Sequence, residues 1–123
     1  MKIKVSEAEG PVLDWMVAKC EGIKEHDMGS FMCPITDAVL AYQYAPSSHW
    51  SQGGPIIERE FVTLAYLKVD GAIRWEARKF SKSHTRFLAM EYGPTPLIAA
   101  MRCYVTSKLG DEVDVPEVLC EEP

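Results

Sequence analysis

The sequence has no hydrophobic run of the roughly 18 to 20 residues that are needed to cross a bilayer. Its first ten residues, MKIKVSEAEG, lack the apolar stretch of about 7 to 15 residues that marks a signal peptide. Neither a membrane span nor a secretion signal is therefore predicted. We expect a cytoplasmic protein with no membrane partner.

Closely spaced cysteines are absent as well. The four cysteines stand far apart, at Cys20, Cys33, Cys103 and Cys120. No Cys-x-x-Cys pair exists that would form a redox motif or half of a zinc site, and reduced thiols are expected. The spacing of Cys20, His26 and Cys33 matches no standard metal site. The sequence predicts no metal and no cofactor.

Positive charge is scarce, because 13 Lys and Arg face 18 Asp and Glu, which gives a formal net charge of -5. This balance opposes a global attraction to nucleic acid or to anionic membranes. The 123 residues, of which 47% are hydrophobic, are typical of one globular domain. We predict a single domain over residues 1–110 and an acidic, solvated tail over residues 111–123, because that segment has no basic residue.

Three segments have the pattern of helices, at about residues 7–21, 48–60 and 95–109. The last is the best defined, with Thr95 as the N-cap, Pro96 at the first helical position and Gly110 after the final turn. Its apolar side chains cover more than half of the circumference, so we expect it to be the centre of the core. In the second segment two glycines and Pro55 weaken the start, and the firm part is predicted from Pro55 onward.

A β-hairpin is predicted over residues 61–69 and 72–80, because Asp70-Gly71 suits a two-residue type I′ turn. If Val69 faces Ala72, the register places Trp75 on the side that packs inward against the last helix. Other segments are less clearly patterned. Lys2–Val5 suits a short edge strand, 23–35 a loop and 38–44 a short strand, while the stretch between Phe80 and Tyr92 suits a long connection or a further irregular strand. The expected fold class is α+β, with a small antiparallel sheet built around the hairpin and packed with helices.

Three blocks of the sequence resemble one family of phage proteins. They are LDWMVAKCEG (13–22), YAPSSHWSQGGPIIERE (44–60) and YGPTPLIAAMRCYVTSKLGDEVDVP (92–116). Together they look like the NinX proteins of lambdoid phages and prophages, and the order of elements is more faintly similar to a small α/β/α sandwich domain of other phage proteins. The resemblance implies an accessory phage protein in the host-cell cytoplasm, for which the family has no established activity.

Catalytic motifs are missing: there is no nucleophile elbow, phosphate loop, dinucleotide fingerprint or metalloprotease helix. A histidine with carboxylates can perform acid-base chemistry, which directs attention to His49, Glu58, Arg59 and Glu60. An ordinary charged helix end is the favoured interpretation of these residues. We predict no catalytic residue, and a small hydrolase or nuclease is the least supported hypothesis.

Gly53 and Gly54 allow two interpretations. Before a helix they could present backbone N–H groups to an anion, since the first N–H groups of a helix have no internal partner. Close packing of the backbone explains the glycines as well and is favoured.

Nucleic-acid binding is the alternative function, carried by a basic stretch over residues 74–86. Its candidates are Arg74, Arg78, Lys79, Lys82 and Arg86. A basic strand with aromatic neighbours can hold phosphates and stack unpaired bases. Charge balance against the acidic tail is the competing explanation.

The leading hypothesis is a non-enzymatic protein-interaction module. We do not expect one small core to cover all of its large apolar side chains. The candidate contact residues are therefore Trp15, Trp50 and Leu67. The expected partners are a second copy of the chain or another phage or host protein.

Overall fold

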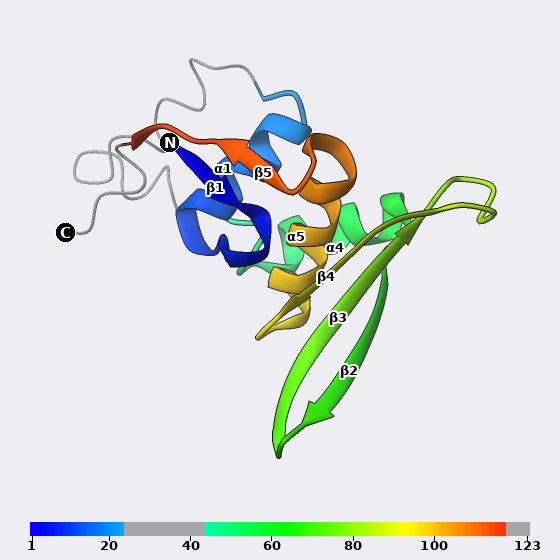
Figure 1. Cartoon of the computed structure of the whole chain (residues 1–123). Coiled ribbons are helices and arrows are strands. Elements are labelled where there is room, and N and C mark those ends of the chain that lie inside the picture. Colours follow the sequence, from blue (N-terminus) through cyan, green and yellow to red (C-terminus); the bar gives the residue numbers. More distant parts are fainter. Residues whose placement is uncertain (24–43, 118–123) are drawn as a thin grey trace.

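The computed structural model describes residues 1–23 and 44–117. The loop predicted at 23–35 and the strand predicted at 38–44 lie outside the described residues, except for their outermost positions, as do Cys33 and Cys120. The described chain has an α+β arrangement in which three consecutive strands stand between the helices α4 and α5 (Figure 1). In chain order they are β1 (Lys2–Lys4), the 3-10 turn η1 (Val5–Glu7), α1 (Gly10–Cys20), α4 (Trp50–Glu60), β2 (Thr63–Val69), β3 (Ala72–Phe80), β4 (Phe87–Gly93), α5 (Pro96–Leu109) and β5 (Glu112–Asp114).

Helix α5 is the centre of the core, as predicted. It begins where the sequence indicates, because the Thr95 side chain accepts a hydrogen bond from the Ile98 N–H at 3.1 Å and Pro96 occupies the first turn. Met101 and Val105 are fully buried in the cluster that joins α5 to α1 and to the sheet. The helix contacts β3 and β4 on one side and α1 and α4 on the other, so it needs apolar side chains almost all round.

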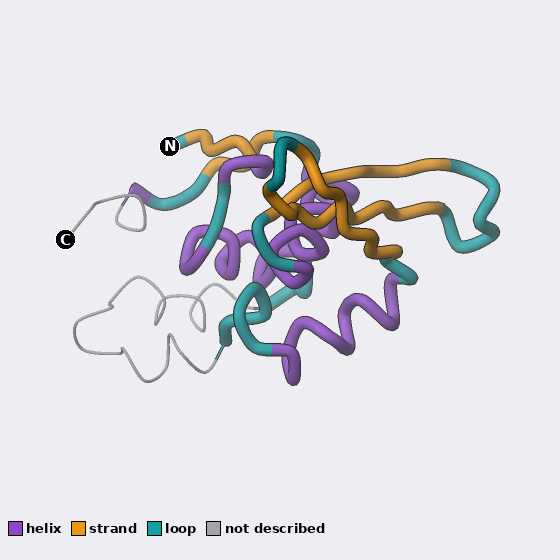
Figure 2. The backbone as a smooth tube through the Cα atoms, turned by 90° about the horizontal axis from the view of Figure 1, so that it is seen from below, coloured by secondary structure: helices purple, strands orange, loops and turns teal. Residues whose placement is uncertain are grey.

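The predicted hairpin is confirmed, and β4 completes a three-stranded antiparallel sheet in the order β2-β3-β4. Asp70 and Gly71 both have positive φ, at 51° and 81°, as a type I′ turn requires, and Val69 pairs with Ala72. For the stretch between Phe80 and Tyr92 the sequence leaves open a long connection or a further strand. The structure has a further strand there, β4. The described helices lie on one side of this sheet (Figure 2).

A second, two-stranded sheet corrects the expectation of a solvated segment from Asp111 onward. Strand β5 pairs antiparallel with β1, and Ile3 lies opposite Val113. Val113 and Val115 are buried and close the core beside α5, which explains why acidic neighbours do not keep this segment in solvent. The side chains of Glu112 and Asp114, on either side of Val113, point outward to solvent.

The first helix starts later than predicted, whereas the second extends over nearly the whole of its predicted range, 48–60. Residues Val5–Glu7 form a separate 3-10 turn, and α1 begins only at Gly10. Helix α4 begins at Trp50, so Gly53, Gly54 and Pro55 lie inside it rather than before it. Tertiary packing outweighs the low helix propensity of these three residues, because Gly53 is buried against a neighbouring segment.

Candidate functional site

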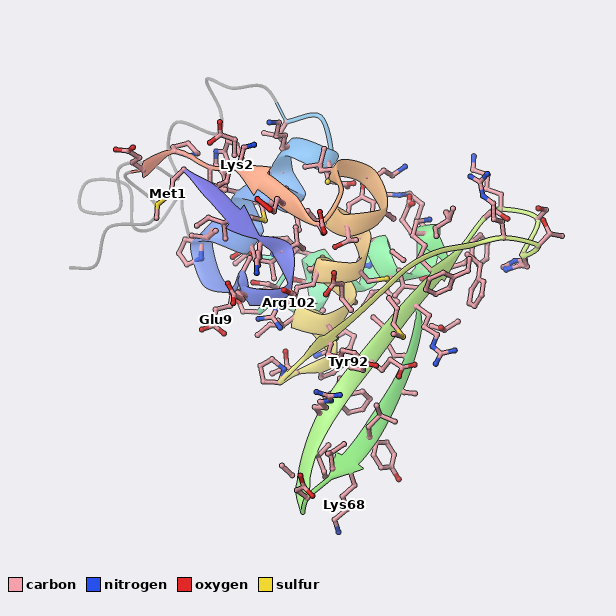
Figure 3. The ribbon with its side chains drawn as sticks, in the orientation of Figure 1. Met1, Lys2, Glu9, Lys68, Tyr92 and Arg102 are labelled. Atoms are coloured by element: carbon pink, nitrogen blue, oxygen red, sulfur yellow. The ribbon has the colours of Figure 1, made fainter. Side chains whose placement is uncertain are left out.

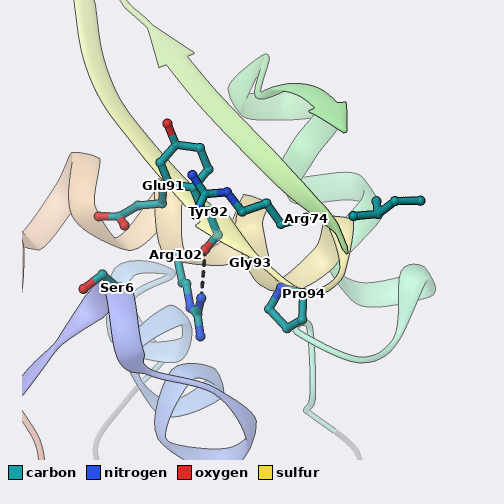
Figure 4. Close-up of a pocket in the computed structure, with 8 residues that line it drawn as sticks. Ser6, Arg74, Glu91, Tyr92, Gly93, Pro94 and Arg102 are labelled. Atoms are coloured by element: carbon teal, nitrogen blue, oxygen red, sulfur yellow. Dashed lines mark hydrogen bonds between the residues drawn. The ribbon is translucent and has the colours of Figure 1, made fainter. Parts of the chain in front are cut away.

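A cavity of about 470 Å³ opens at the end of β4, where the sheet meets η1 and α5. Its lining residues come from four parts of the chain, and Figure 4 shows most of them. They are Ser6, Ile73, Arg74, Glu91, Tyr92, Gly93, Pro94 and Arg102. Gly93 is required here, because a Cβ at this position would lie 2.7 Å from the Ala99 nitrogen. The close contact between β4 and α5 thus sets the shape of the cavity.

Arg102 forms the inner wall of the cavity, and only 8% of it is exposed. Its Nε donates to the Ala8 carbonyl and its Nη1 to the Tyr92 carbonyl, both at 2.8 Å. Burial lowers the pKa of Arg102, while the charges of Glu9 and Glu91 act in the opposite direction. No carboxylate of the described residues lies within ion-pair distance of it. Arg102 therefore ties η1 to β4 and leaves a positive charge at the cavity wall.

Arg74 and Tyr92 form the outer wall. The Arg74 guanidinium lies 4.1 Å from the centre of the Tyr92 ring, a cation-π contact that holds the arginine along the strand. Glu91 is engaged elsewhere, because its Oε2 accepts a hydrogen bond from the Thr106 hydroxyl at 2.9 Å. The lining thus combines two arginines with one carboxylate that is already hydrogen-bonded, and none of its residues is a histidine or a cysteine.

The hairpin extends beyond the helices next to this cavity (Figures 1 and 3). We call residues 66–74 its projecting half. Tyr66 is 65% exposed and Ile73 58% exposed there, and Val69 is exposed as well. Ile73 and Arg74 line the cavity too, so the exposed apolar end of the hairpin and the cavity form one continuous surface.

The face of the sheet opposite α5 adds to this surface. Register places Arg74, Glu76 and Arg78 on it, beside Leu67 of β2 and Met90 of β4. Within residues 44–117 and 1–23, no helix packs on this face (Figure 2). Glu76 is nevertheless buried, because the Arg78 side chain pairs with it from two positions along the strand.

Comparison with protein families gives one result, a match over residues 4–108 to the family described as Bacteriophage P22, NinX. The chain belongs to the NinX family. The match includes the first two blocks on which the resemblance was based, residues 92–108 of the third, and the hairpin between them. Membership indicates a phage accessory protein. A comparison with curated proteins found no match.

The structure separates the three apolar residues that the sequence of this NinX-family chain suggested for contact. Trp15 is wrong as an exposed contact residue, because it is only 9% exposed and belongs to the core cluster, with Lys19 packed against its ring. Trp50 is 55% exposed at the start of α4. Leu67 is half-buried on the uncovered face of the sheet.

For the two glycines, the anion hypothesis is corrected. The Gly53 N–H already donates to the His49 carbonyl at 2.9 Å, within the first turn of α4. Close approach explains Gly53, since a Cβ there would overlap the Pro46 carbonyl oxygen and lie 2.6 Å from Leu97 Cδ2. It does not explain Gly54, whose Cβ would meet only Trp50, at 3.9 Å.

The basic residues of the nucleic-acid hypothesis point in different directions. Lys79 is buried on the helix side of the sheet, where its Nζ lies 3.1 Å from Glu60. Arg78 is paired with Glu76 on the other face. Arg74 stacks on Tyr92 and, like Arg78, is exposed on the uncovered face, whereas Lys82 and Arg86 are exposed in the loop between β3 and β4. The stretch 74–86 does not form one basic surface.

The histidine and carboxylates of the hydrolase hypothesis do not converge either. His49 is the N-cap of α4 and Glu58 lies in its last turn, so about 14 Å of helix separates them. Glu60 and Arg59 belong instead to a network that joins α4 to three other elements. Arg59 lies 2.6 Å from Glu21, the residue that caps the end of α1. Tyr104 of α5 also donates to Glu21, and Lys79 of β3 pairs with Glu60. This network stabilises the fold.

The pKa values of the two carboxylates fit that role. Burial acts to raise the pKa of Glu60, but hydrogen bonds from Arg59 and Lys79 outweigh it and lower the pKa overall. The pKa of Glu21 is lowered in the same way, by Arg59 and Tyr104 against burial. Both groups remain charged at neutral pH, which is unsuited to a general acid.

Two searches of the described part of the chain were negative. No group of three or more His, Cys, Asp and Glu side chains is arranged to hold a metal ion. No helix there combines the length and the apolar character needed to cross a membrane. The cysteines in this part, Cys20 and Cys103, are free, and burial raises the pKa of each thiol to about 12.

Sequence reasoning missed Tyr66, Ile73, Tyr92 and Arg102. The register of the hairpin assigned Tyr66 and Ile73 to the inward side, and the structure confirms that side. The signal that would have identified these two residues is the length of the hairpin strands relative to the helix that covers them. The hairpin strands extend past the helix that covers them, so their inward side is exposed at the far end.

Proposed function

We propose that this phage accessory protein is a protein-interaction module without catalytic activity of its own. The observation that carries the proposal is the projecting half of the hairpin, where large apolar side chains are exposed on two paired strands. Exposed apolar patches beside charged groups are typical of protein contact sites. Tyr66 and Ile73 are the central contact residues.

The chemistry of the surface describes the partner. Beside the apolar end of the hairpin, the cavity presents Arg74 and the partly occupied guanidinium of Arg102. A phage or host protein with an apolar patch and a neighbouring Asp or Glu side chain fits this pattern, because the carboxylate would reach two arginines in a partly desolvated cavity. The formal charge of -5 on the whole chain makes such a local contact more selective.

The test compares one double variant with a matched control. Tyr66→Ser combined with Ile73→Ser removes the apolar end of the hairpin, whereas Trp50→Ser removes an equally exposed aromatic side chain from α4. Proteins captured by the unmodified chain from infected cells are identified, purified and titrated against all three forms by calorimetry.

We expect a purified phage or host protein to bind the unmodified chain and Trp50→Ser alike. The double variant should bind at least about tenfold more weakly, since truncating a hot-spot residue at the centre of an interface costs about 2 kcal/mol or more. Equal binding by the double variant, or no purified protein that binds at all, would overturn the proposal.

A further inference from the structure

The outer edge of β2 is an open strand edge. The order β2-β3-β4 makes β2 and β4 the two edges of the three-stranded sheet. At the β4 edge the Tyr92 carbonyl accepts a hydrogen bond from Arg102, and η1 lies against the strand. No described strand or helix covers the edge of β2 in this way. A seven-residue edge with unpaired backbone groups is a template for another strand.

The turn determines which backbone groups are free. In a hairpin with a two-residue turn, the pair next to the turn exchanges both hydrogen bonds, and bonded pairs then alternate along the strands. Val69, Leu67, Ala65 and Thr63 therefore direct their N–H and C=O groups toward β3. Leu64, Tyr66 and Lys68 direct theirs outward, away from the sheet.

We propose that β2 pairs with β2 of a second copy of this chain, antiparallel about a two-fold axis at Tyr66, to make one continuous six-stranded sheet. In this register Tyr66 faces Tyr66 of the second copy, and Thr63 faces Val69. All seven residues of the strand are then paired, and Leu64, Tyr66 and Lys68 exchange hydrogen bonds with one another across the axis.

The side chains of β2 are complementary to themselves in this register. On the uncovered face Ala65 meets Leu67 of the second copy, and on the helix side Lys68 meets Leu64, so the two lysines are not opposed. Tyr66 already packs edge-on against Trp75, with ring centres 5.9 Å apart. The two-fold extends this pair to a row of four aromatic rings, and it covers the most exposed large apolar side chain of the hairpin.

The same register also accounts for exposure at the base of the hairpin. It places the turn Asp70-Gly71 of the second copy beside Val62 and Phe61, and Phe61 is exposed just after the end of α4. Both helix layers lie on the same side of the six-stranded sheet, because the two-fold axis is perpendicular to the sheet.

The cavity with Arg74 and Arg102 lies at the β4 edge, so it stays accessible in the dimer. The inference rests on the proposed function and deepens it by naming a second copy of the chain as the partner that covers Tyr66, which leaves Ile73 and the cavity for a separate protein.

Lys68→Pro tests the pairing with little effect on the monomer. Its N–H points outward, so proline removes no hydrogen bond to β3 and is tolerated at an edge of this kind. In the dimer the same N–H is one of the bonds across the axis. Lys68→Ala is the matched control, since it removes the side chain and keeps the N–H.

Sedimentation of the full chain over a range of concentrations gives the first readout. We expect a dimer for the unmodified chain and for Lys68→Ala, and a dissociation constant at least about tenfold higher for Lys68→Pro. Amide exchange followed by NMR gives a second readout that needs no variant. The Leu64, Tyr66 and Lys68 amides should exchange more slowly as the concentration rises, while exposed amides outside β2 should not change.

A monomer at every concentration up to about 1 mM, or a dimer that Lys68→Pro leaves intact, would overturn the inference. So would a dimer whose Leu64, Tyr66 and Lys68 amides stay unprotected. These outcomes differ from failure of the proposed function. A strict monomer that still binds a phage or host protein removes only the pairing, and a dimer that binds no other protein removes only the contact with a separate partner.

Discussion

The hairpin β2–β3 has two halves with the same alternation of side chains and different surroundings. Near the body, Ala77 and Lys79 of β3 are buried against the helix layer. Near the turn, Ile73 lies on the same face of the same strand and is mostly exposed. The alternation determines which face a side chain occupies, and the extent of the covering layer determines whether that face is buried.

The two halves of the hairpin differ in burial because helix α5 is too short to cover the whole hairpin. Helix α5 has 14 residues and spans about 21 Å, and it crosses the sheet at β4 and at the near half of β3. It contacts β2 only weakly. The projecting half therefore has paired backbone but few tertiary contacts, which is typical of a segment whose side chains serve a partner rather than the core.

Met101→Ala should have the largest effect on stability, because Met101 is fully buried where α5 packs in the core. Truncation of a buried methionine typically costs about 2–5 kcal/mol in the free energy of unfolding. Ile73→Ala removes a similar volume from the projecting half and should change that free energy by no more than about 0.5 kcal/mol. Urea denaturation at low protein concentration measures both. Similar losses for the two variants would mean that the projecting half is part of the core.

Gly53→Ala should come next, at about 2–3 kcal/mol of destabilisation. The new methyl group would overlap the Pro46 carbonyl, and a backbone oxygen cannot move aside as a flexible side chain can. Gly54→Ala, one position along α4, is the control, because it meets only Trp50. Its gain in helix propensity is opposed by the restriction that Pro55 imposes on the preceding residue, so a change within about 1 kcal/mol is expected. Thermal unfolding of both variants checks the ranking, and equal losses would contradict it.

Local chemistry explains which elements of the fold were predictable from the sequence. Thr95, Pro96 and Gly110 define α5 by capping, and Asp70-Gly71 defines the hairpin by the φ angles of the turn. Both signals act over a few residues and do not depend on the rest of the chain. With the two further helices that the hydrophobic periodicity predicted, they led to a hairpin-centred α+β fold.

The errors came from contacts between residues far apart in sequence. The helix over 48–60 was predicted, but its first turns were expected to be weak, because the packing of Gly53 against Pro46 and Leu97 is visible only in three dimensions. Strand β5 was missed because Val113 and Val115 gain burial from the first strand of the chain, and the acidic residues around them suggested solvent. At the candidate site, Trp15 was proposed as a contact residue because one small core was not expected to cover it fully, but the structure buries it. Arg102 was missed because its partners are backbone carbonyls, which no side-chain motif records.

Glu60→Gln should destabilise the chain by about 1–2 kcal/mol at pH 7, because it leaves the buried Lys79 ammonium without a charged partner. The pKa of Glu60 is lower in the folded chain than its usual value of 4.5. Its contribution to stability is therefore fully present above about pH 4.5 and is lost as the pH falls through the folded value. Urea denaturation from pH 7 to pH 3 should show the difference between the two proteins shrinking toward the acid end. A constant difference across this range would show that the charge of Glu60 is not what stabilises the network.

The smallest expected effect on global stability is that of Gly71→Ala, at the turn of the projecting half. Gly71 has a φ of 81°, and a side chain there is strained by about 1 kcal/mol although no neighbour lies within 4 Å of the new Cβ. Because the projecting half has few contacts with the body, opening of the turn can relieve the strain locally. The Leu67 and Arg74 amides, which pair near the turn, should then exchange several-fold faster, while the Ala77 and Lys79 amides, under α5, should keep their rates. If all four amides accelerate together, the hairpin unfolds as one unit with the core, and the contrast between its two halves does not extend to their dynamics.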